Sequence, residues 1–209
     1  MLQKEAIEPR TLQLLKALQA DSMFAQFHLA GGTGLALQLG HRLSVDLDLF
    51  SITPFDSSFY LEYLEKNYQF ALDFSAISTL KGSIDGVKVD FIAHSYKLLL
   101  PVLEKDQISI YSLADIAAMK VNAIAGNGTR SKDFVDMYCL LELYSVSQIL
   151  EFYQNKYNDR NTFHALKSLN YFDEVDLSDW PVLISKKRFT WNTVKKSIEK
   201  KCKEFMKEL

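Results

Sequence analysis

Residues 30–50 read AGGTGLALQLGHRLSVDLDLF, and this stretch decides the fold of the N-terminal half. A short apolar segment precedes Gly31 and Gly32, and a helical pattern follows Thr33. Where a glycine turn joins a strand to a helix, the glycines let the backbone approach a ligand closely. The N–H groups and the positive dipole end of the helix then face that ligand. The turn therefore favours a phosphate, with the Thr33 hydroxyl as a further donor. A simple tight turn is the alternative for the glycine pair alone.

Two aspartates lie near the end of the same stretch. Asp46 and Asp48 stand two residues apart in the alternating run VDLDLF, which is typical of a β-strand, so both side chains are expected on one face of a sheet. Carboxylates that converge in this way resist ionising together unless they share a proton or a cation. An oxygen-only pair favours Mg²⁺ or Mn²⁺. A solvated strand face explains the pair alone equally simply, but the nearby glycine turn favours a site.

A third acid lies in the segment VKVDFIAH. Asp90 belongs to the second arm of a hairpin whose turn is predicted at Asp85-Gly86. If this arm neighbours the strand of Asp46 and Asp48, three carboxylates gather on one sheet face. Phosphoryl and nucleotidyl transfer need such an arrangement, because divalent ions activate the attacking hydroxyl and neutralise the leaving oxygens while a carboxylate takes the proton. Taken alone, Asp90 is also explained as a surface residue.

Periodicity along the rest of the chain predicts the fold class α+β. Residues 1–105 alternate short helices with extended segments and predict a small mixed sheet with flanking helices. Residues 106–209 hold one more extended segment, ISIYS, and then a period near 3.6, which predicts a C-terminal helical bundle. Helices are expected at residues 11–20, 33–38, 57–67, 113–126, 131–144, 147–157 and from 192 onward, and extended segments at 27–30, 45–50, 70–84 and 87–93.

The helical half contributes four further candidate residues. Lys120 falls on the apolar stripe of the helix expected at 113–126, where a lysine is unexpected unless it snorkels to solvent. Lys132, Asp133 and Asp136 open the next helix, where acids near the N-terminus are favourable for capping reasons alone. Both an electrostatic role in a site and these structural explanations therefore stay open.

Composition and charge exclude several classes of protein. The chain has 209 residues, of which 48% are hydrophobic and 24% charged, so neither disorder nor a fibrous repeat is expected. Two cysteines and four scattered histidines argue against a disulfide framework and a structural zinc site. The sequence has no apolar run of the ~18 residues that a membrane span needs, and its first residues lack the apolar segment of a secretion signal. A cytoplasmic protein that does not associate with a membrane is therefore expected.

The net charge of −2 conceals an asymmetry. Residues 186–209 hold nine Lys or Arg and three Glu, a net +6, so the rest of the chain carries −8. A basic tail beside an acidic body suits a phosphate-binding arm next to a carboxylate-rich site, although a solvated helix face explains the tail as well.

The stretch GGTGLALQLGHRLSVDLDLF, followed by VDF, MKVNAI and SKDFVDMYCLL, resembles the AbiEii/AbiGii family of nucleotidyltransferase-like toxins, within the polymerase-beta-type nucleotidyltransferase superfamily. The resemblance covers most of residues 25–145. It implies a phosphate-cradling turn, a metal-binding aspartate pair with a third carboxylate, an HRxS element, a lysine that reaches a nucleotide phosphate and a KDxxD element at the cleft. The phosphate-cradling turn falls on Gly31, Gly32 and Thr33, and the aspartate pair with its third carboxylate falls on Asp46, Asp48 and Asp90. The HRxS element falls on Arg42 and Ser44, the phosphate-binding lysine on Lys120, and the KDxxD element on Lys132, Asp133 and Asp136.

The resemblance further implies an activity and partners. We expect transfer of a nucleoside monophosphate from an NTP to an RNA acceptor, such as a tRNA 3′ end, with Mg²⁺ or Mn²⁺ as cofactor and with the active cleft between the two halves. A cognate antitoxin encoded nearby is the implied protein partner. The competing hypothesis is a nucleotide-binding or regulatory module of the same fold without turnover. A dinucleotide-binding fold is disfavoured, because Leu37 stands where the third glycine of its fingerprint belongs.

Overall fold

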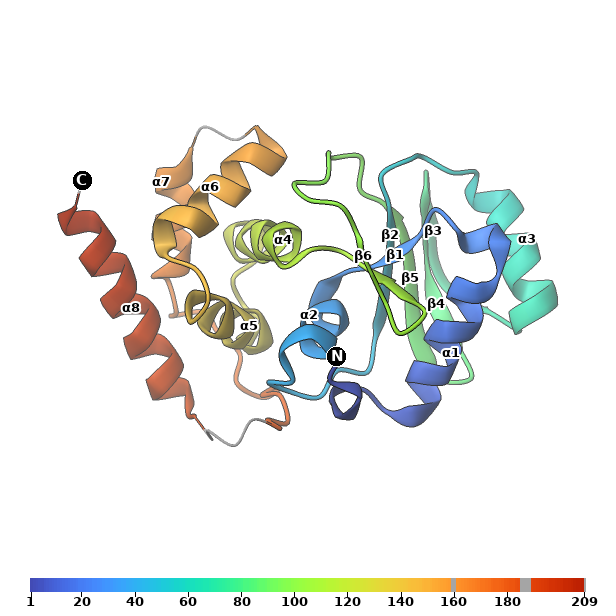
Figure 1. The fold of residues 1–209 in the computed structure, drawn as a ribbon, viewed down its shortest axis with the longest axis horizontal. Coiled ribbons are helices and arrows are strands. Elements are labelled where there is room, and N and C mark those ends of the chain that lie inside the picture. Colours follow the sequence, from blue (N-terminus) through green and yellow to red (C-terminus); the bar gives the residue numbers. More distant parts are fainter. Residues whose placement is uncertain (159–160, 185–188, 209) are drawn as a thin grey trace. The chain divides into compact units, whose positions relative to one another are not determined.

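The computed structural model describes residues 1–158, 161–184 and 189–208, and the chain divides into two compact units, Met1–Tyr111 and Ser112–Leu209 (Figure 1). This division differs from the expected boundary between residues 105 and 106. The segment that follows residue 106 forms β7 (Ile108–Ile110), and Leu29 of the first unit pairs with Ile110 in parallel register. The last extended segment is therefore a strand of the first unit's sheet.

The first unit is built on one mixed sheet of seven strands in the order β3-β4-β5-β2-β1-β7-β6. β2 is parallel to β5 and β1 is parallel to β7, while the other neighbours are antiparallel. This confirms the expected α+β class with a mixed sheet. The remaining strands are β1 (His28–Leu29), β2 (Leu47–Ser51), β3 (Ala71–Ala76), β4 (Thr79–Ile84), β5 (Val87–Ala93) and β6 (Leu103–Lys105).

Three α-helices accompany this sheet, namely α1 (Pro9–Ala20), α2 (Gly31–Leu39) and α3 (Ser57–Tyr68). Short 3-10 turns occupy Lys4–Ala6 and Ser22–Phe24. Pro9 suits the first turn of α1, where its missing N–H would have no helical partner. The carboxylate of Asp56 accepts from the N–H groups of Ser58 and Phe59, so Asp56 caps α3.

Alternation along β2 and β5 gives the sheet one apolar face and one mixed face. Leu47 and Leu49 of β2 and Phe91 of β5 are fully buried on the first face. Phe91 lies at ring-centroid distances of 5.2 Å from both Phe24 and Phe27, which precede β1. Buried aromatic rings contribute more free energy than other side chains of the core. The core therefore fixes the sheet from one side and leaves the other face for Asp48 and Asp90.

Two extended segments depart from the sequence-based prediction. The run expected at residues 70–84 is split into β3 and β4 by a turn in which Ser78 adopts a φ of 49°. β6 was not expected at all, and it pairs with β7 across a turn at Asp106 and Gln107, both with positive φ. These turns lack glycine, which is the usual signal of a left-handed position, so the sequence gives little warning of them.

The second unit consists of helices α4 (Leu113–Gly126), α5 (Ser131–Leu141), α6 (Val146–Tyr157), α7 (Thr162–Leu169) and α8 (Trp191–Lys207). α4 packs against α5, α6 and α7, which confirms the helical bundle. The Ser112 hydroxyl accepts from the Asp115 N–H and so caps the start of α4. α7 was not predicted, because it is short and only its Asn161 cap signals it. Over the described residues, no helix has the length and apolar character needed to cross a membrane.

α8 has an apolar stripe on one face and lysines on the other. Val194, Ile198 and Cys202 are fully buried and Phe205 is partly buried, whereas Leu209 lies outside the described residues, as do Lys186, Lys187 and Arg188 of the basic tail. The exposed lysines of the helix are Lys196, Lys200, Lys203 and Lys207.

Candidate functional site

Two of the three candidate carboxylates meet in the sheet. β2 and β5 are parallel neighbours, and Asp48 lies directly opposite Asp90 in their register. Side chains at paired positions of adjacent strands lie on the same face of the sheet. The expectation that the strand of Asp90 neighbours that of Asp48 is therefore confirmed. Asp46 precedes the first residue of β2, so the strand begins later than the pattern VDLDLF predicts.

The glycine turn lies against Asp48. Gly31 begins α2 with a φ of 61°, a left-handed conformation that glycine adopts without steric cost. A Cβ at this position would overlap the Oδ2 atom of Asp48 and would lie 2.7 Å from its Cγ. Residue 31 therefore has to be glycine for two reasons, the backbone conformation and the room that the carboxylate occupies.

The second glycine makes room for the HRxS element. A Cβ at Gly32 would overlap the guanidinium of Arg42 and would lie 3.6 Å from the Ser44 hydroxyl. Arg42 is buried, and its guanidinium also donates to the carbonyl of Leu43 at 3.0 Å. The structure thus brings Arg42 and Ser44 to the glycine turn, as the sequence resemblance implies.

Thr33 is buried and fastens the turn to the aspartate segment. Its hydroxyl lies 2.8 Å from the Ser44 hydroxyl and donates to the carbonyl of Asp46. These bonds place the backbone of Asp46 beside the first turn of α2. The Thr33 hydroxyl therefore holds the site together in this structure, a role that the glycine-turn pattern did not suggest.

The first turn of α2 can receive an anion. Its N-cap is Ala30, and no side chain caps the helix. N–H groups in the first turn of a helix have no acceptor within the helix, and the helix dipole adds positive potential there. The turn thus has hydrogen-bond donors for a phosphate next to Asp48, which pairs with Asp90 in the sheet.

Lys81 is a residue of this face that the sequence analysis missed. It stands opposite Asp90 in the antiparallel register of β4 and β5, and its ammonium lies 3.0 Å from the Asp90 carboxylate. The two-residue turn at Asp85 and Gly86 fixes that register, because it places residues equally distant from the turn across from one another. The pairing could therefore have been found by counting back from the predicted hairpin.

The residues present fit a divalent cation in part. Asp48 and Asp90 supply carboxylate oxygens on one sheet face, and Gly31 leaves Asp48 the space it occupies. Within the described ranges, however, no three acidic, histidine or cysteine side chains are grouped closely enough to hold a metal ion. The observed fit is that of two carboxylates, with Asp46 two residues before Asp48.

In the second unit, Lys120 joins two of the other candidates. Its ammonium lies 2.7 Å from Oδ1 of Asp133 and 2.7 Å from Oδ2 of Asp136, so a lysine of α4 bridges two aspartates of α5. Lys120 is only 7% exposed, which excludes the snorkelling that its place on the apolar stripe allowed. The other oxygen of Asp133, Oδ2, is buried without a hydrogen-bond partner and lies 3.8 Å from Nε of Arg130.

Lys132 lies outside this cluster. Its ammonium is 2.6 Å from the exposed carboxylate of Asp179, and Ser131 donates to the backbone carbonyl of the same residue. Lys132 therefore ties the start of α5 to the segment that precedes α8. The KDxxD element thus splits into two aspartates directed at Lys120 and one lysine directed elsewhere.

A second buried ion pair supports the helical unit. Lys156 of α6 lies 2.7 Å from Asp115 of α4, and both side chains are fully inaccessible to solvent. The Ser112 hydroxyl donates to the other carboxylate oxygen of Asp115 at 2.6 Å. A buried charge of this kind is strongly destabilising when its partner is removed. This pair is structural, and its lysine was not singled out from the sequence.

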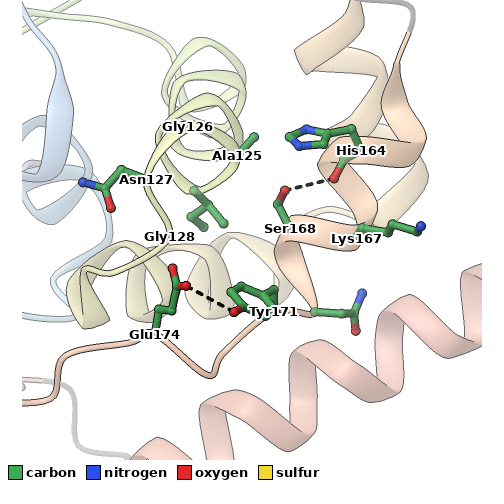
Figure 2. A pocket seen from close by; sticks show the side chains of 11 residues that line it. Ala125, Gly126, Asn127, Gly128, His164, Lys167, Ser168, Tyr171 and Glu174 are labelled. Atoms are coloured by element: carbon green, nitrogen blue, oxygen red, sulfur yellow. Dashed lines mark hydrogen bonds between the residues drawn. The ribbon is translucent and has the colours of Figure 1, made fainter.

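A polar pocket of about 540 Å³ lies elsewhere in the second unit, where α7 faces the end of α4 (Figure 2). Figure 2 shows His164 and Ser168 on the side of the pocket that faces Ala125. The Tyr171 hydroxyl donates a hydrogen bond to the Glu174 carboxylate at 3.3 Å. None of the residues that the sequence analysis singled out lines this pocket.

Comparison with known proteins places these features in a family. A curated relative, an uncharacterized protein of Aquifex aeolicus, is 29% identical over 192 residues, which cover 86% of this chain and 88% of the relative. A crystal structure from Helicobacter pylori, proposed to be a nucleotidyltransferase, matches with a TM-score of 0.51 and 15% identity over 97% of this chain and 99% of its own. The H. pylori protein JHP933 gives a TM-score of 0.47 and 16% identity over 97% and 96%.

The family model described as "Nucleotidyl transferase AbiEii toxin, Type IV TA system" matches residues 13–88 and 82–200. The match spans the glycine turn, the aspartates of the sheet and the Lys120 cluster, and the H. pylori structure shares the fold. This chain belongs to the AbiEii family of nucleotidyl transferase toxins of type IV toxin–antitoxin systems.

Proposed function

We propose that the protein transfers a nucleoside monophosphate from an NTP to a hydroxyl group of an RNA, such as a tRNA 3′ end, and releases pyrophosphate. The observation that carries this proposal is the placement of Asp48 opposite Asp90, with Gly31 against the Asp48 carboxylate. Backbone N–H groups that can donate hydrogen bonds to a phosphate would then lie beside carboxylates that can bind a cation, and nucleotidyl transfer needs both.

In this proposal the sheet residues divide the work. Asp46, Asp48 and Asp90 would hold Mg²⁺ or Mn²⁺, and such an ion, when bound, would lower the pKa of the attacking hydroxyl and neutralise charge on the phosphate oxygens. The N–H groups at Gly31 and Gly32 bind the triphosphate, while Arg42, Ser44 and Thr33 fix the turn that carries them. Asp90 accepts the proton of the acceptor hydroxyl.

A separate group of candidate residues lies within the helical unit. Lys120 contributes positive charge for a nucleotide phosphate, and Asp133 and Asp136 hold its ammonium group in a fixed position. Lys132 orders the start of α5 through its ion pair with Asp179. Transition-state stabilisation then comes from positioning and from charge neutralisation, which are the main terms in phosphoryl transfer.

The RNA acceptor is proposed to contact the exposed lysines of α8. Lys196, Lys200, Lys203 and Lys207 are exposed, whereas Lys201 is bonded to the carbonyl of Leu141 and Lys195 lies over the Phe172 ring. Each phosphate that a lysine neutralises adds to the salt dependence of binding. Glutamine at the four exposed positions should weaken RNA binding and flatten its salt slope, while an unchanged slope would remove α8 from the interface.

The deciding experiment incubates the protein with each of the four labelled NTPs, total RNA and Mg²⁺. We expect label in RNA with the wild type and none with Asp48→Asn, because the cation then loses a ligand. Asp73→Asn is the matched control, since Asp73 is an exposed residue of the edge strand β3. Label that persists in Asp48→Asn would refute the proposed site.

The alternative function is a nucleotide-binding or regulatory module without turnover. It is favoured by the ion pair between Lys81 and Asp90 and by the absence of a group of three metal-ligating side chains among the described residues. Binding of NTP and metal by the wild type without labelling of any RNA would select this alternative.

The proposed location of the protein is the cytoplasm. A cognate antitoxin is the proposed protein partner, because the family is that of toxin–antitoxin systems.

A further inference from the structure

The ion pair between Lys81 and Asp90 lies on the face that carries the proposed site. Lys81, on β4, is 45% exposed at its side chain and Asp90, on β5, is 26% exposed. On the other side of Asp90, Asp48 occupies the paired position of β2. Three neighbouring strands thus present, in one row across the sheet, a lysine, an aspartate and an aspartate.

The row carries two negative charges and one positive charge. Two aspartates side by side repel one another, and the lysine ammonium 3.0 Å from Asp90 offsets one of the two negative charges. A divalent cation that binds both carboxylates would offset the same charge. An ammonium and a divalent cation near one carboxylate also repel each other, so they compete for Asp90.

We propose that Lys81 is a built-in counter-cation of Asp90 that sets the affinity of the carboxylate pair for divalent ions. The proposal rests on the proposed function, because it assumes that Asp48 and Asp90 bind a cation. In the protein without metal, the ammonium of Lys81 holds the Asp90 carboxylate by an ion pair in place of the ion. Lys81 is therefore a positioning residue that acts through Asp90.

The test measures Mn²⁺ binding without nucleotide or RNA, by the electron paramagnetic resonance signal of free Mn²⁺. Lys81→Met should bind Mn²⁺ about tenfold more tightly, which is the order of change that a unit charge roughly 5 Å from a divalent ion produces in a water-like dielectric. Lys81→Arg keeps the charge and should bind like the wild type. The side chain is partly exposed, so both variants are expected to fold, and circular dichroism checks this.

Two further variants separate contact from general charge. Lys88→Met removes a lysine of the same strand face, one that pairs with Ser83 rather than with an aspartate, and should change Mn²⁺ affinity much less. In an Asp90→Asn background the competition for Asp90 is absent, so Lys81→Met should tighten binding less than it does in the wild-type background. An equal effect of Lys88→Met, or an undiminished effect in Asp90→Asn, would overturn the proposal.

The outcomes also distinguish this inference from the proposed function. If Asp48→Asn weakens Mn²⁺ binding but Lys81→Met matches the wild type, the role of Lys81 is refuted and the metal site stands. If the wild type and Lys81→Met both fail to bind Mn²⁺ at millimolar concentration, the metal site fails and the role of Lys81 fails with it. As a second readout, the Mg²⁺ concentration for half-maximal RNA labelling should fall in Lys81→Met.

Discussion

Replacing Gly31 by alanine should damage the proposed site far more than it damages the fold. Gly31 has a φ of 61°, and a left-handed conformation costs an alanine about 1–2 kcal/mol. The added Cβ would also overlap Oδ2 of Asp48 and lie 2.7 Å from its Cγ and 3.0 Å from its Cβ. Relief requires the Asp48 side chain or the backbone of the turn to move, and such overpacking costs a further 1–3 kcal/mol or so.

Gly86→Ala provides the matched control. Gly86 has a φ of 76° in the turn between β4 and β5, and a Cβ there would meet nothing within 4 Å. Both variants carry the backbone strain, but only Gly31→Ala displaces Asp48. We therefore expect Gly86→Ala to lose about 1–2 kcal/mol of unfolding free energy and Gly31→Ala about 2–5 kcal/mol, with the difference caused by the overlap.

The activity should separate the two variants more widely than the stability. A misplacement of about 1 Å in a catalytic group costs on the order of 10²-fold in rate, so labelling of RNA by Gly31→Ala should fall by about that factor. Gly86→Ala should label RNA at close to the wild-type rate. Urea denaturation and the labelling assay, on protein that is folded by circular dichroism, measure both quantities. Equal labelling by the two alanine variants would show that Asp48 does not act from the position seen here.

Three further predictions concern stability. Lys156→Met should lower the unfolding free energy by about 3–5 kcal/mol, because it leaves Asp115 buried without its cation, and adding Asp115→Asn should recover much of the loss in urea denaturation. Burial lowers the pKa of His28 below 6.5, although the charge of Glu104 acts in the opposite sense. As the pH falls, His28 therefore takes up a proton in the unfolded chain before it does so in the folded chain, and the stability that neutral His28 provides above about pH 6.5 is lost. His28→Gln should reduce this loss of stability, which urea midpoints measured from about pH 7.5 to 5 check. Asp56→Ala should cost about 1 kcal/mol by thermal denaturation, because the first N–H groups of α3 lose their acceptor; an unchanged melting temperature would contradict the cap.

The sheet and most helices were predictable because their patterns are local. Strict alternation marks β2 and β5, and the turn at Asp85 and Gly86 fixes how β4 and β5 pair. The pairing of β2 with β5 is non-local, and the sequence suggested it only as a condition for the site. β6 and the turn inside the run at residues 70–84 escaped detection because non-glycine residues with positive φ give no clear sequence signal.

The sequence analysis named most residues of the candidate site, but it did not predict which of them contact one another. The sequence pointed to Gly31 and Asp48, but it could not show that the glycine exists to leave room for that carboxylate. Lys120 looked misplaced on an apolar stripe, and the physical reason, two aspartates of the following helix, depends on how α4 and α5 pack. Thr33 was assigned to a phosphate, whereas in the fold its hydroxyl bonds Ser44 and Asp46.

The parallel pairing of β2 with β5 also determines when the two carboxylates can meet during synthesis. A helix and a hairpin separate the two strands along the chain, so Asp48 and Asp90 become neighbours only after the ribosome has released β5 and that strand has docked. Such late, long-range closure is slow compared with helix formation. A nascent chain that stalls within the hairpin carries the glycine turn and Asp48 without Asp90, so the proposed site stays incomplete until β5 has been made and has docked beside β2.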